Sequence, residues 1–264
     1  MCPDFWRYKD AFPDFQSEMF SFPHICAIII AVAIVVASVI LMKNKSREQV
    51  SRFLKVMSII VLIMEIAIFL WEYYGGKRYL GAPDYTTILP VWTCSLITYT
   101  LLGAAWGKGI VERCCLSYLG TIGLLAGASG ILLVNGLRSY PFWTLGALYS
   151  FTYHFIMLFV GCIILATGYY KPQWKDVFYS FIPIVCLAVF AIPIDYHFKA
   201  DYMLLYEGKG APVLPLIARS LAQHHLRGLY TLFALFIYLP VSALMIGIDK
   251  WLFSFRRCPI SPQR

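Results

Sequence analysis

The sequence predicts an all-α integral membrane protein, built as a bundle of seven transmembrane helices. Three observations predict this class: 60% of the residues are hydrophobic, only 14% are charged, and the mean hydropathy is +0.70. A soluble domain carries about 25% charged residues, so this chain has too little polar surface to cover a water-soluble globule. Its 264 residues suffice for one domain of roughly seven helices at about 20 residues per span.

Seven apolar runs are each long enough to cross about 30 Å of hydrocarbon as a helix. They are His24–Met42, Leu54–Tyr74, Thr86–Trp106, Leu116–Val134, Leu145–Thr167, Val177–Ile194 and Leu229–Ile248. The third run begins with a proline, Pro90. A proline is tolerated in the first turn of a helix, where its missing N–H would have no partner. We therefore expect Thr86–Trp106 to be a helix with Pro90 near its start.

Basic residues predict the orientation of the bundle. They gather in the first, third and fifth loops and after the last span: Lys43, Lys45, Arg47, Arg52, Lys55, Lys108, Arg113, Lys171, Lys175, Lys250, Arg256 and Arg257. The alternate short loops hold only Lys77, Arg78 and Arg138. The positive-inside rule then places the N-terminus outside (or in the lumen) and the C-terminus in the cytoplasm.

We expect three parts along the chain: an extracellular or lumenal segment at residues 1–23, a transmembrane domain at 24–250, and a basic cytoplasmic tail at 251–264. The transmembrane domain includes one long outer loop, residues 195–228, and loops of this kind on a rigid scaffold often bind ligands or act as lids. The predicted location is a multi-pass position in the cell membrane of a bacterium or in an endomembrane of a eukaryote.

Four glycines of the fourth run, Gly120, Gly123, Gly127 and Gly130, follow one another at steps of three, four and three. This spacing predicts a stripe on one helix face. A stripe of small residues lets two helix backbones approach closely in lipid. We interpret the stripe as internal packing in preference to an oligomer interface, with oligomerisation left open.

The net charge of +8 does not indicate a nucleic-acid partner, because Lys and Arg lie in the short loops that set membrane topology. The eight cysteines include no CxxC pair, so neither a disulfide framework nor a zinc site is indicated. We predict membrane lipids as partners, and no nucleic acid, metal or cofactor.

Three polar side chains lie at similar depth, counted from the outer helix ends: Cys94, His154 and Glu65. A cysteine becomes a nucleophile when a neighbouring histidine takes its proton and an acid orients that histidine. Ionisable residues inside a membrane are costly and usually functional. Structural alternatives stand beside this one: Cys94 as a packing residue, His154 as a hydrogen-bonded bundle histidine, and Glu65 as a protonated acid bonded to a carbonyl.

Several short motifs together resemble the YwaF / transmembrane protein 164 family of seven-span membrane proteins. They are Leu89-Pro90-x-x-x-Cys94-Ser95-Leu96, Glu65 in the second span, Tyr153-His154 in the fifth, Gly168-Tyr169-Tyr170-Lys171-Pro172, and Asp201-Tyr202-Met203-Leu204. The resemblance extends from about Leu54 to Ile248. This chain departs from the family pattern at Trp92, where histidine is usual, and at Asp195 and Asp201, where asparagine is usual.

The resemblance implies an acyltransferase that moves fatty acyl chains between phospholipids and lysophospholipids. It implies catalytic roles for Cys94 and His154, and we expect Glu65 to orient this relay or to supply charge to it. We further predict that Trp92, Asp195, Asp201 and Tyr202 contribute to substrate binding.

A second hypothesis is a non-enzymatic transporter or binding protein with an intramembrane acidic site at Glu65. The sequence shows no paired inverted repeats and no sign of broken helices, which weakens this reading. Pro183 and Pro240 leave it open, because each proline can kink a span.

Overall fold

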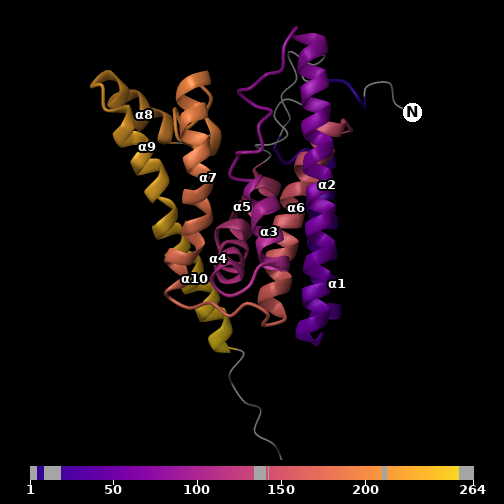
Figure 1. The fold of residues 1–264 in the computed structure, drawn as a ribbon. Helices are drawn as coiled ribbons and strands as arrows, with labels where there is room; N and C mark the ends of the chain where they lie inside the picture. The colour runs from indigo at the N-terminus through magenta and orange to yellow at the C-terminus, as the bar shows by residue number, and fades with distance from the viewer. Residues whose placement is uncertain (1–4, 9–18, 134–140, 142, 210–212, 256–264) are drawn as a thin grey trace, which may run out of the picture.

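The computed structural model describes residues 5–8, 19–133, 141, 143–209 and 213–255. The described residues form helices and connecting segments (Figure 1). The helices are α1 (Phe22–Met42), α2 (Arg47–Tyr79), α3 (Leu96–Trp106), α4 (Ile110–Leu119), α5 (Ile122–Leu132), α6 (Leu145–Ala166), α7 (Asp176–Phe198), η3 (Tyr202–Leu204), α8 (Leu214–Gln223), α9 (Arg227–Phe236) and α10 (Tyr238–Phe255). The all-α prediction is therefore confirmed.

Six helical stretches of the described chain are long and apolar enough to cross a membrane. They are α1, α2, the stretch of α4 and α5, α6, α7, and the stretch of α9 and α10. Local signals begin two of them: Ser46 and Gln49 form a capping box before α2, and the Thr144 hydroxyl accepts the N–H of Ala147 at the start of α6. Such caps satisfy N–H groups that have no partner inside the helix.

The third predicted span is shorter than expected. Only Leu96–Trp106 is helical, and 11 residues at about 1.5 Å each cannot cross about 30 Å of hydrocarbon alone. The preceding residues 84–95 are turns and bends, so the prediction that Pro90 sits in the first turn of a helix was wrong. Figure 1 shows the chain descending from the end of α2 through this irregular stretch into α3. We call residues 84–95 the unwound segment.

Hydroxyl groups from distant elements stabilise the unwound segment. Tyr202 accepts the N–H of Leu89 at 3.0 Å and donates to the carbonyl of Tyr85 at 3.0 Å. Burial raises the pKa of the Tyr202 phenol, so its hydroxyl keeps the proton that it donates. Two more tyrosine hydroxyls reach the segment's carbonyls: Tyr99 to Pro90 at 2.9 Å and Tyr118 to Thr93 at 3.0 Å. Non-helical backbone at membrane depth requires such partners because lipid offers none.

The fourth predicted span is broken in the middle. α4 ends at Leu119 and α5 begins at Ile122, with Gly120 and Thr121 between them. A Cβ on Gly120 would lie 2.6 Å from the Tyr170 ring, so this glycine leaves room for the aromatic side chain. The glycine stripe is therefore divided between the break and α5. The expectation that the sequence contained no broken helix was wrong.

The remaining stripe glycines permit close helix packing inside the chain. A Cβ on Gly127 would lie 2.4 Å from the backbone nitrogen of Leu158, and one on Gly130 would lie 1.9 Å from the His154 ring. Both contacts are with α6, which packs closely against α5. These glycines thus bring the α5 backbone close to α6, as small residues do in membranes.

Prolines act differently in the two last spans. α7 runs from Asp176 to Phe198 with Pro183 and Pro193 inside it. The final span is interrupted at Ile237, between α9 and α10, and Pro240 follows in the first turn of α10. This is a helix start, where proline is tolerated.

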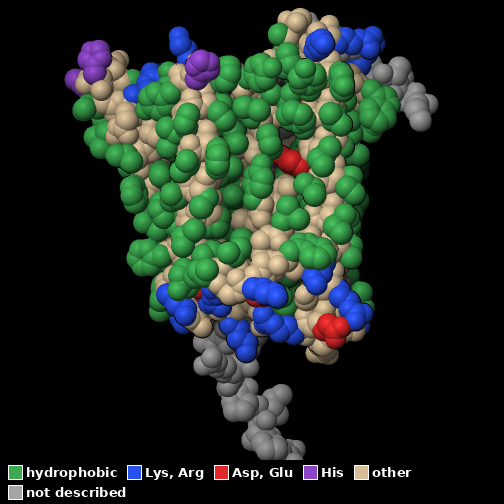
Figure 2. All heavy atoms as spheres, in the orientation of Figure 1, with side chains coloured by type: hydrophobic (Ala, Val, Ile, Leu, Met, Phe, Trp, Pro, Cys, Tyr) green, Lys and Arg blue, Asp and Glu red, His purple; other side chains and the backbone are tan. Residues whose placement is uncertain are grey.

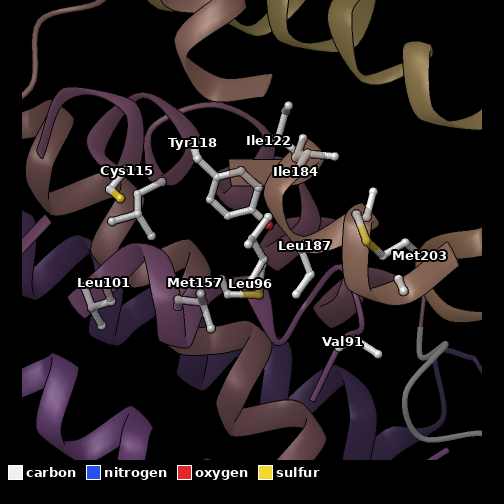
Figure 3. Packing of buried hydrophobic residues seen from close by; sticks show 14 of the residues in the cluster. Val91, Leu96, Leu101, Cys115, Tyr118, Ile122, Met157, Ile184, Leu187 and Met203 are labelled. Atoms are coloured by element: carbon white, nitrogen blue, oxygen red, sulfur yellow. The ribbon is translucent and has the colours of Figure 1, made fainter. Parts of the chain in front are cut away.

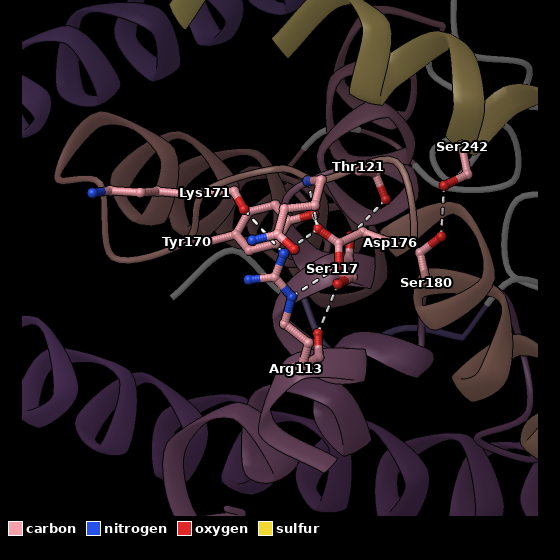
Figure 4. Close-up of polar contacts among 9 residues, drawn as sticks. Arg113, Ser117, Thr121, Tyr170, Lys171, Asp176, Ser180 and Ser242 are labelled. Carbon is pink, nitrogen blue, oxygen red and sulfur yellow. Dashed lines mark hydrogen bonds and ion pairs between the residues drawn. The ribbon is translucent and has the colours of Figure 1, made fainter. Parts of the chain in front are cut away.

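A buried ion pair joins α4 to the start of α7 (Figure 4), and α7 starts at the end of the bundle opposite α8 (Figure 1). Asp176 is fully buried and accepts hydrogen bonds from both Nε and Nη2 of Arg113. It also accepts the Tyr170 hydroxyl at 3.1 Å and the N–H of Gln173 at 2.7 Å. Burial raises the pKa of Tyr170, which keeps its hydroxyl a donor. Bidentate pairing of this kind fixes the relative position of the two helices.

The predicted outer loop 195–228 is largely ordered and partly helical. It contains the end of α7, η3, α8 and the start of α9. α8 lies at one end of the bundle (Figure 1), which we call the α8 end. The N-terminal residues reach the ends of two long helices: Tyr8 packs on Gly75 of α2, and Phe5 accepts the N–H of Leu145.

The hydrophobic core lies between α2, α3, α4, α6 and α7. Figure 3 shows the Tyr118 ring at its centre, with Leu96, Ile184 and Leu187 around it. On the outside, a broad hydrophobic band separates two ends that carry Lys and Arg side chains (Figure 2). This is the surface that lipid requires, since water-facing proteins rarely expose such large apolar areas.

Candidate functional site

Cys94 lies where the unwound segment meets α3. Ser95 is the N-cap of α3, and the N–H of Ile97 donates to the Cys94 carbonyl at 3.0 Å. The expected helix over Thr86–Trp106 would have included Cys94, but no helix joins Pro90 to Cys94. The thiol instead sits at the N-terminus of α3, where the helix dipole places partial positive charge.

Polar groups from four helices surround the thiol. The Glu65 carboxylate of α2 lies close enough to interact with the thiol electrostatically. Three tyrosines are close enough to interact electrostatically with the sulfur: Tyr118, Tyr149 and Tyr238.

Glu65 of α2 is buried, with 8% of its surface exposed, and hydroxyl groups of α3 and α6 surround its carboxylate. Its Oε2 atom accepts hydrogen bonds from Tyr149 at 2.9 Å, from Tyr153 at 2.5 Å and from Thr98 at 3.5 Å. Thr98 and Tyr153 are themselves 2.5 Å apart. We call these four residues the Glu65 cluster.

His154 has a different set of neighbours. Its Nδ1 atom lies 2.8 Å from the carbonyl oxygen of Ser150, and its ring fills the space left by Gly130. A carbonyl only accepts, so Nδ1 carries the proton and, in the neutral ring, Nε2 keeps a free lone pair. Among the described residues, no hydrogen bond joins His154 to Cys94 or to Glu65. The Ser150 carbonyl therefore orients the imidazole.

Three of the four predicted substrate-binding residues meet at the α8 end. The Tyr202 ring contacts the Trp92 ring with centroids 4.7 Å apart, and the N–H of Tyr202 donates to Asp195 Oδ1 at 2.8 Å. The other oxygen of Asp195 is buried, and within the described part of the chain it has no hydrogen-bond partner. The Trp92 indole donates to the Thr87 carbonyl at 3.0 Å.

The fourth of these residues, Asp201, shapes the chain after η3. Its carboxylate accepts the N–H groups of four consecutive residues, Tyr206, Glu207, Gly208 and Lys209, at 2.6–3.1 Å. Nearby Lys199, Met203 and Leu204 have positive φ angles of 53°, 54° and 62°. Non-glycine residues hold such conformations only when their surroundings impose them, and Asp195 and Asp201 supply that constraint.

Residues on either side of Cys94 line two apolar cavities. A groove of about 680 Å³ lies between α3, α4 and α7, and Pro90, Val91 and Leu96 form part of its wall. A smaller cavity of about 220 Å³ includes Thr93 and Tyr238. The first volume falls in the range of about 300–1,000 Å³ that is usual for ligand sites.

The TMEM164 family matches this chain over residues 19–248. The chain belongs to the TMEM164 family. The membrane class and the multi-pass location predicted from composition are thereby confirmed. No curated protein and no solved structure matches the chain. The matched region includes the motifs around Glu65, Cys94 and His154.

Sequence reasoning missed most of the Glu65 cluster of this TMEM164 protein. Thr98 follows Cys94 by four residues, and Tyr149 precedes Tyr153 by four. A step of four puts two side chains on one helix face, so this spacing was the available signal. Among the described residues, no group of three or more His, Cys, Asp or Glu side chains is placed to hold a metal ion.

Proposed function

We propose that this protein is a membrane-embedded acyltransferase that exchanges acyl chains between phospholipids and lysophospholipids through Cys94. The observation that supports it most is the place of the Cys94 thiol: at the N-terminus of α3, with lining residues of an apolar groove on either side in sequence, Val91 and Leu96. The groove offers room for an acyl chain, and the helix N-terminus offers N–H groups for a developing negative charge.

In the proposed reaction the Cys94 sulfur attacks an ester carbonyl of a phospholipid. The carbon–oxygen bond of the ester breaks, an acyl-cysteine thioester forms, and the lysolipid alkoxide leaves with a proton. A hydroxyl of a second lysolipid then attacks the thioester, gives up its proton and releases the thiol. The buried surroundings favour transfer over hydrolysis because they exclude water.

His154 is proposed as the base that takes these protons and returns them. Its free Nε2 lone pair suits that role, and the Ser150 carbonyl fixes the tautomer. The imidazole needs to approach Cys94 in the lipid-bound state, and catalytic hydrogen bonds are commonly long in the absence of substrate. Replacing His154 with Gln is expected to lower acyl exchange by about 10²–10⁴-fold, the usual contribution of a general base.

The test compares two cysteines near the same groove. We expect Cys94→Ala to abolish both acyl exchange and the acyl-enzyme adduct seen by intact-protein mass spectrometry. Cys186→Ala serves as the matched control, because Cys186 is exposed on α7 and lines the groove. Exchange that persists in Cys94→Ala at the native rate would remove the mechanism.

A second candidate function is a transporter or binding protein whose intramembrane acid is Glu65. Two observations favour it: the Glu65 cluster, and the unwound or broken stretches at residues 84–95 and 120–121. Discontinuous helices line the binding sites of many transporters. This function predicts that Glu65→Gln abolishes solute uptake or binding while Cys94→Ser has no effect. If the protein is an acyltransferase, Cys94→Ser should reduce acyl exchange more than Glu65→Gln does.

A further inference from the structure

We propose that a pocket at the α8 end binds the phosphate group of a membrane lipid. The pocket has a volume of about 220 Å³ and lies between α8, the start of α9 and the segment after η3. Its lining includes three cations, Lys209, Arg219 and Arg227, and one acid, Glu207. Cys94 does not line it, so the proposal is independent of the proposed acyl transfer.

The charges of the pocket are not balanced. Lys209 Nζ lies 2.6 Å from Glu207 Oε2, so the acid is paired with the lysine and two guanidinium groups remain. The guanidinium of Arg227 stacks over the Tyr206 ring, 4.1 Å from its centroid. Its Nη1 atom is buried, and no hydrogen-bond partner for it lies among the residues that the structure describes. A buried donor without an acceptor is costly, and an oxyanion in the pocket would satisfy it.

The chemistry of arginine indicates which oxyanion fits. Guanidinium groups bind phosphate through paired N–H donors with defined geometry. Arg227 is also the first residue of α9, where the helix dipole adds positive partial charge. Two cations beside a helix N-terminus suit a phosphate better than a singly charged carboxylate.

The position of the pocket indicates that the phosphate comes from a lipid. Apolar side chains next to the pocket are exposed, with 58% of Val213, 66% of Leu216 and 47% of Leu226 accessible. Figure 2 shows Lys, Arg and His side chains at the α8 end, directly above the hydrophobic band. Lipid phosphates lie at this boundary. Exposed leucines beside the pocket can contact the acyl chains of a lipid, whereas free phosphate has no apolar part for them to contact.

The experiment measures binding to the full-length protein in a maltoside detergent, by native mass spectrometry or thermophoresis. The probe is lysophosphatidic acid, which has one acyl chain and a phosphate. We expect Arg227→Gln and Arg219→Gln each to weaken binding about tenfold or more, the size of one charge-assisted hydrogen bond. Arg52→Gln is the control, since Arg52 lies at the opposite end and pairs with exposed Glu48.

Competitors distinguish a lipid phosphate from free inorganic phosphate as the bound group. Monoacylglycerol or a free fatty acid of equal chain length is expected to bind at least tenfold more weakly than lysophosphatidic acid, and millimolar inorganic phosphate is expected not to displace it. Equal binding of the uncharged lipid, or displacement by inorganic phosphate, would overturn the lipid-phosphate site.

Arg227→Gln also removes the stacking on Tyr206 and can affect folding, so its unfolding temperature is measured alongside. Arg219 is exposed, and its substitution leaves the fold intact. The proposal would be refuted if both variants bind lysophosphatidic acid with native affinity and Arg227→Gln keeps its native unfolding temperature. Measuring the same affinities in the Cys94→Ala background separates this site from the acyl-transfer proposal.

Discussion

At the scale of single residues, the site depends on hydroxyl groups more than on charges. Tyr149, Tyr153 and Thr98 all donate to one carboxylate oxygen of Glu65. Each donor is buried or half-buried in an apolar bundle. Its hydrogen bond to the carboxylate is therefore electrostatically stronger than the same bond would be in water. The cluster therefore ties α2, α3 and α6 together at the level of Cys94.

One residue-scale prediction concerns the glycine beneath His154. Gly130→Ala would place a methyl group 1.9 Å from the imidazole, so the ring must move. We expect overpacking to lower the free energy of unfolding by about 1–3 kcal/mol and acyl exchange to fall with it. Gly228→Ala is the control, since a Cβ there has nothing within 4 Å and alanine favours a helix. Unchanged stability and exchange in Gly130→Ala would contradict the packing described above.

A second residue-scale prediction concerns Tyr202. Its hydroxyl makes two hydrogen bonds to the unwound segment, and Tyr202→Phe removes both while keeping the ring against Trp92. Leaving the Leu89 N–H and the Tyr85 carbonyl unpaired is expected to cost about 1–3 kcal/mol, measured by thermal unfolding in detergent. Tyr74→Phe, at an exposed tyrosine, is expected to leave the unfolding temperature unchanged. Equal unfolding temperatures for the two variants would show that the unwound segment does not depend on this hydroxyl.

At the scale of elements, the breaks in helices decide where the chemistry can occur. The unwound segment exposes backbone groups at membrane depth, and tyrosines of α3, α4 and η3 satisfy several of them. The interruption at Gly120 and Thr121 separates α4, which packs on α7, from α5, which packs on α6. One span thus contacts both halves of the bundle.

The element-scale prediction tests the ion pair between α4 and α7. Asp176→Asn leaves Arg113 without its buried partner, and breaking such a pair is expected to cost about 3–5 kcal/mol, read from chemical or thermal unfolding. Glu48→Gln is the matched control, because Glu48 and Arg52 are 73% and 75% exposed and pairs of that kind contribute about 0–1 kcal/mol. A loss of stability in Asp176→Asn no larger than in the control would mean that the pair does not hold the helices.

At the scale of the whole molecule, the described chain forms one bundle with a hydrophobic band between two polar ends (Figure 2). The α8 end holds η3, α8 and the phosphate pocket, and the opposite end holds the Arg113–Asp176 pair. The long apolar stretches between them have the length and composition of membrane spans.

The whole-molecule prediction concerns topology. We expect the unwound segment and α3 together to cross the membrane, which gives seven crossings, an outside N-terminus and a cytoplasmic C-terminus. Epitope tags inserted after Leu80 and after Lys108 in the intact chain should then lie on opposite sides of the membrane, by antibody accessibility in sealed vesicles. Tags accessible from the same side would contradict a third crossing.

The sequence alone determined the class of this protein and the position of its long helices. Composition and hydropathy report how much of the chain must face lipid. A helix satisfies all of its backbone hydrogen bonds within one segment, so long apolar runs become helices there. Predicted runs such as Leu145–Thr167 therefore match observed helices such as α6, Leu145–Ala166, almost residue by residue.

Only the tertiary structure decided where helices stop inside the bundle. The backbone of residues 84–95 is partly satisfied by hydroxyl groups from distant parts of the chain, such as Tyr202, which lies 117 positions after Tyr85. The placement of His154 against Gly130 likewise depends on how α5 packs on α6. Hydropathy is a local property, whereas these contacts depend on which helices are neighbours, and the chain fixes that only when it folds.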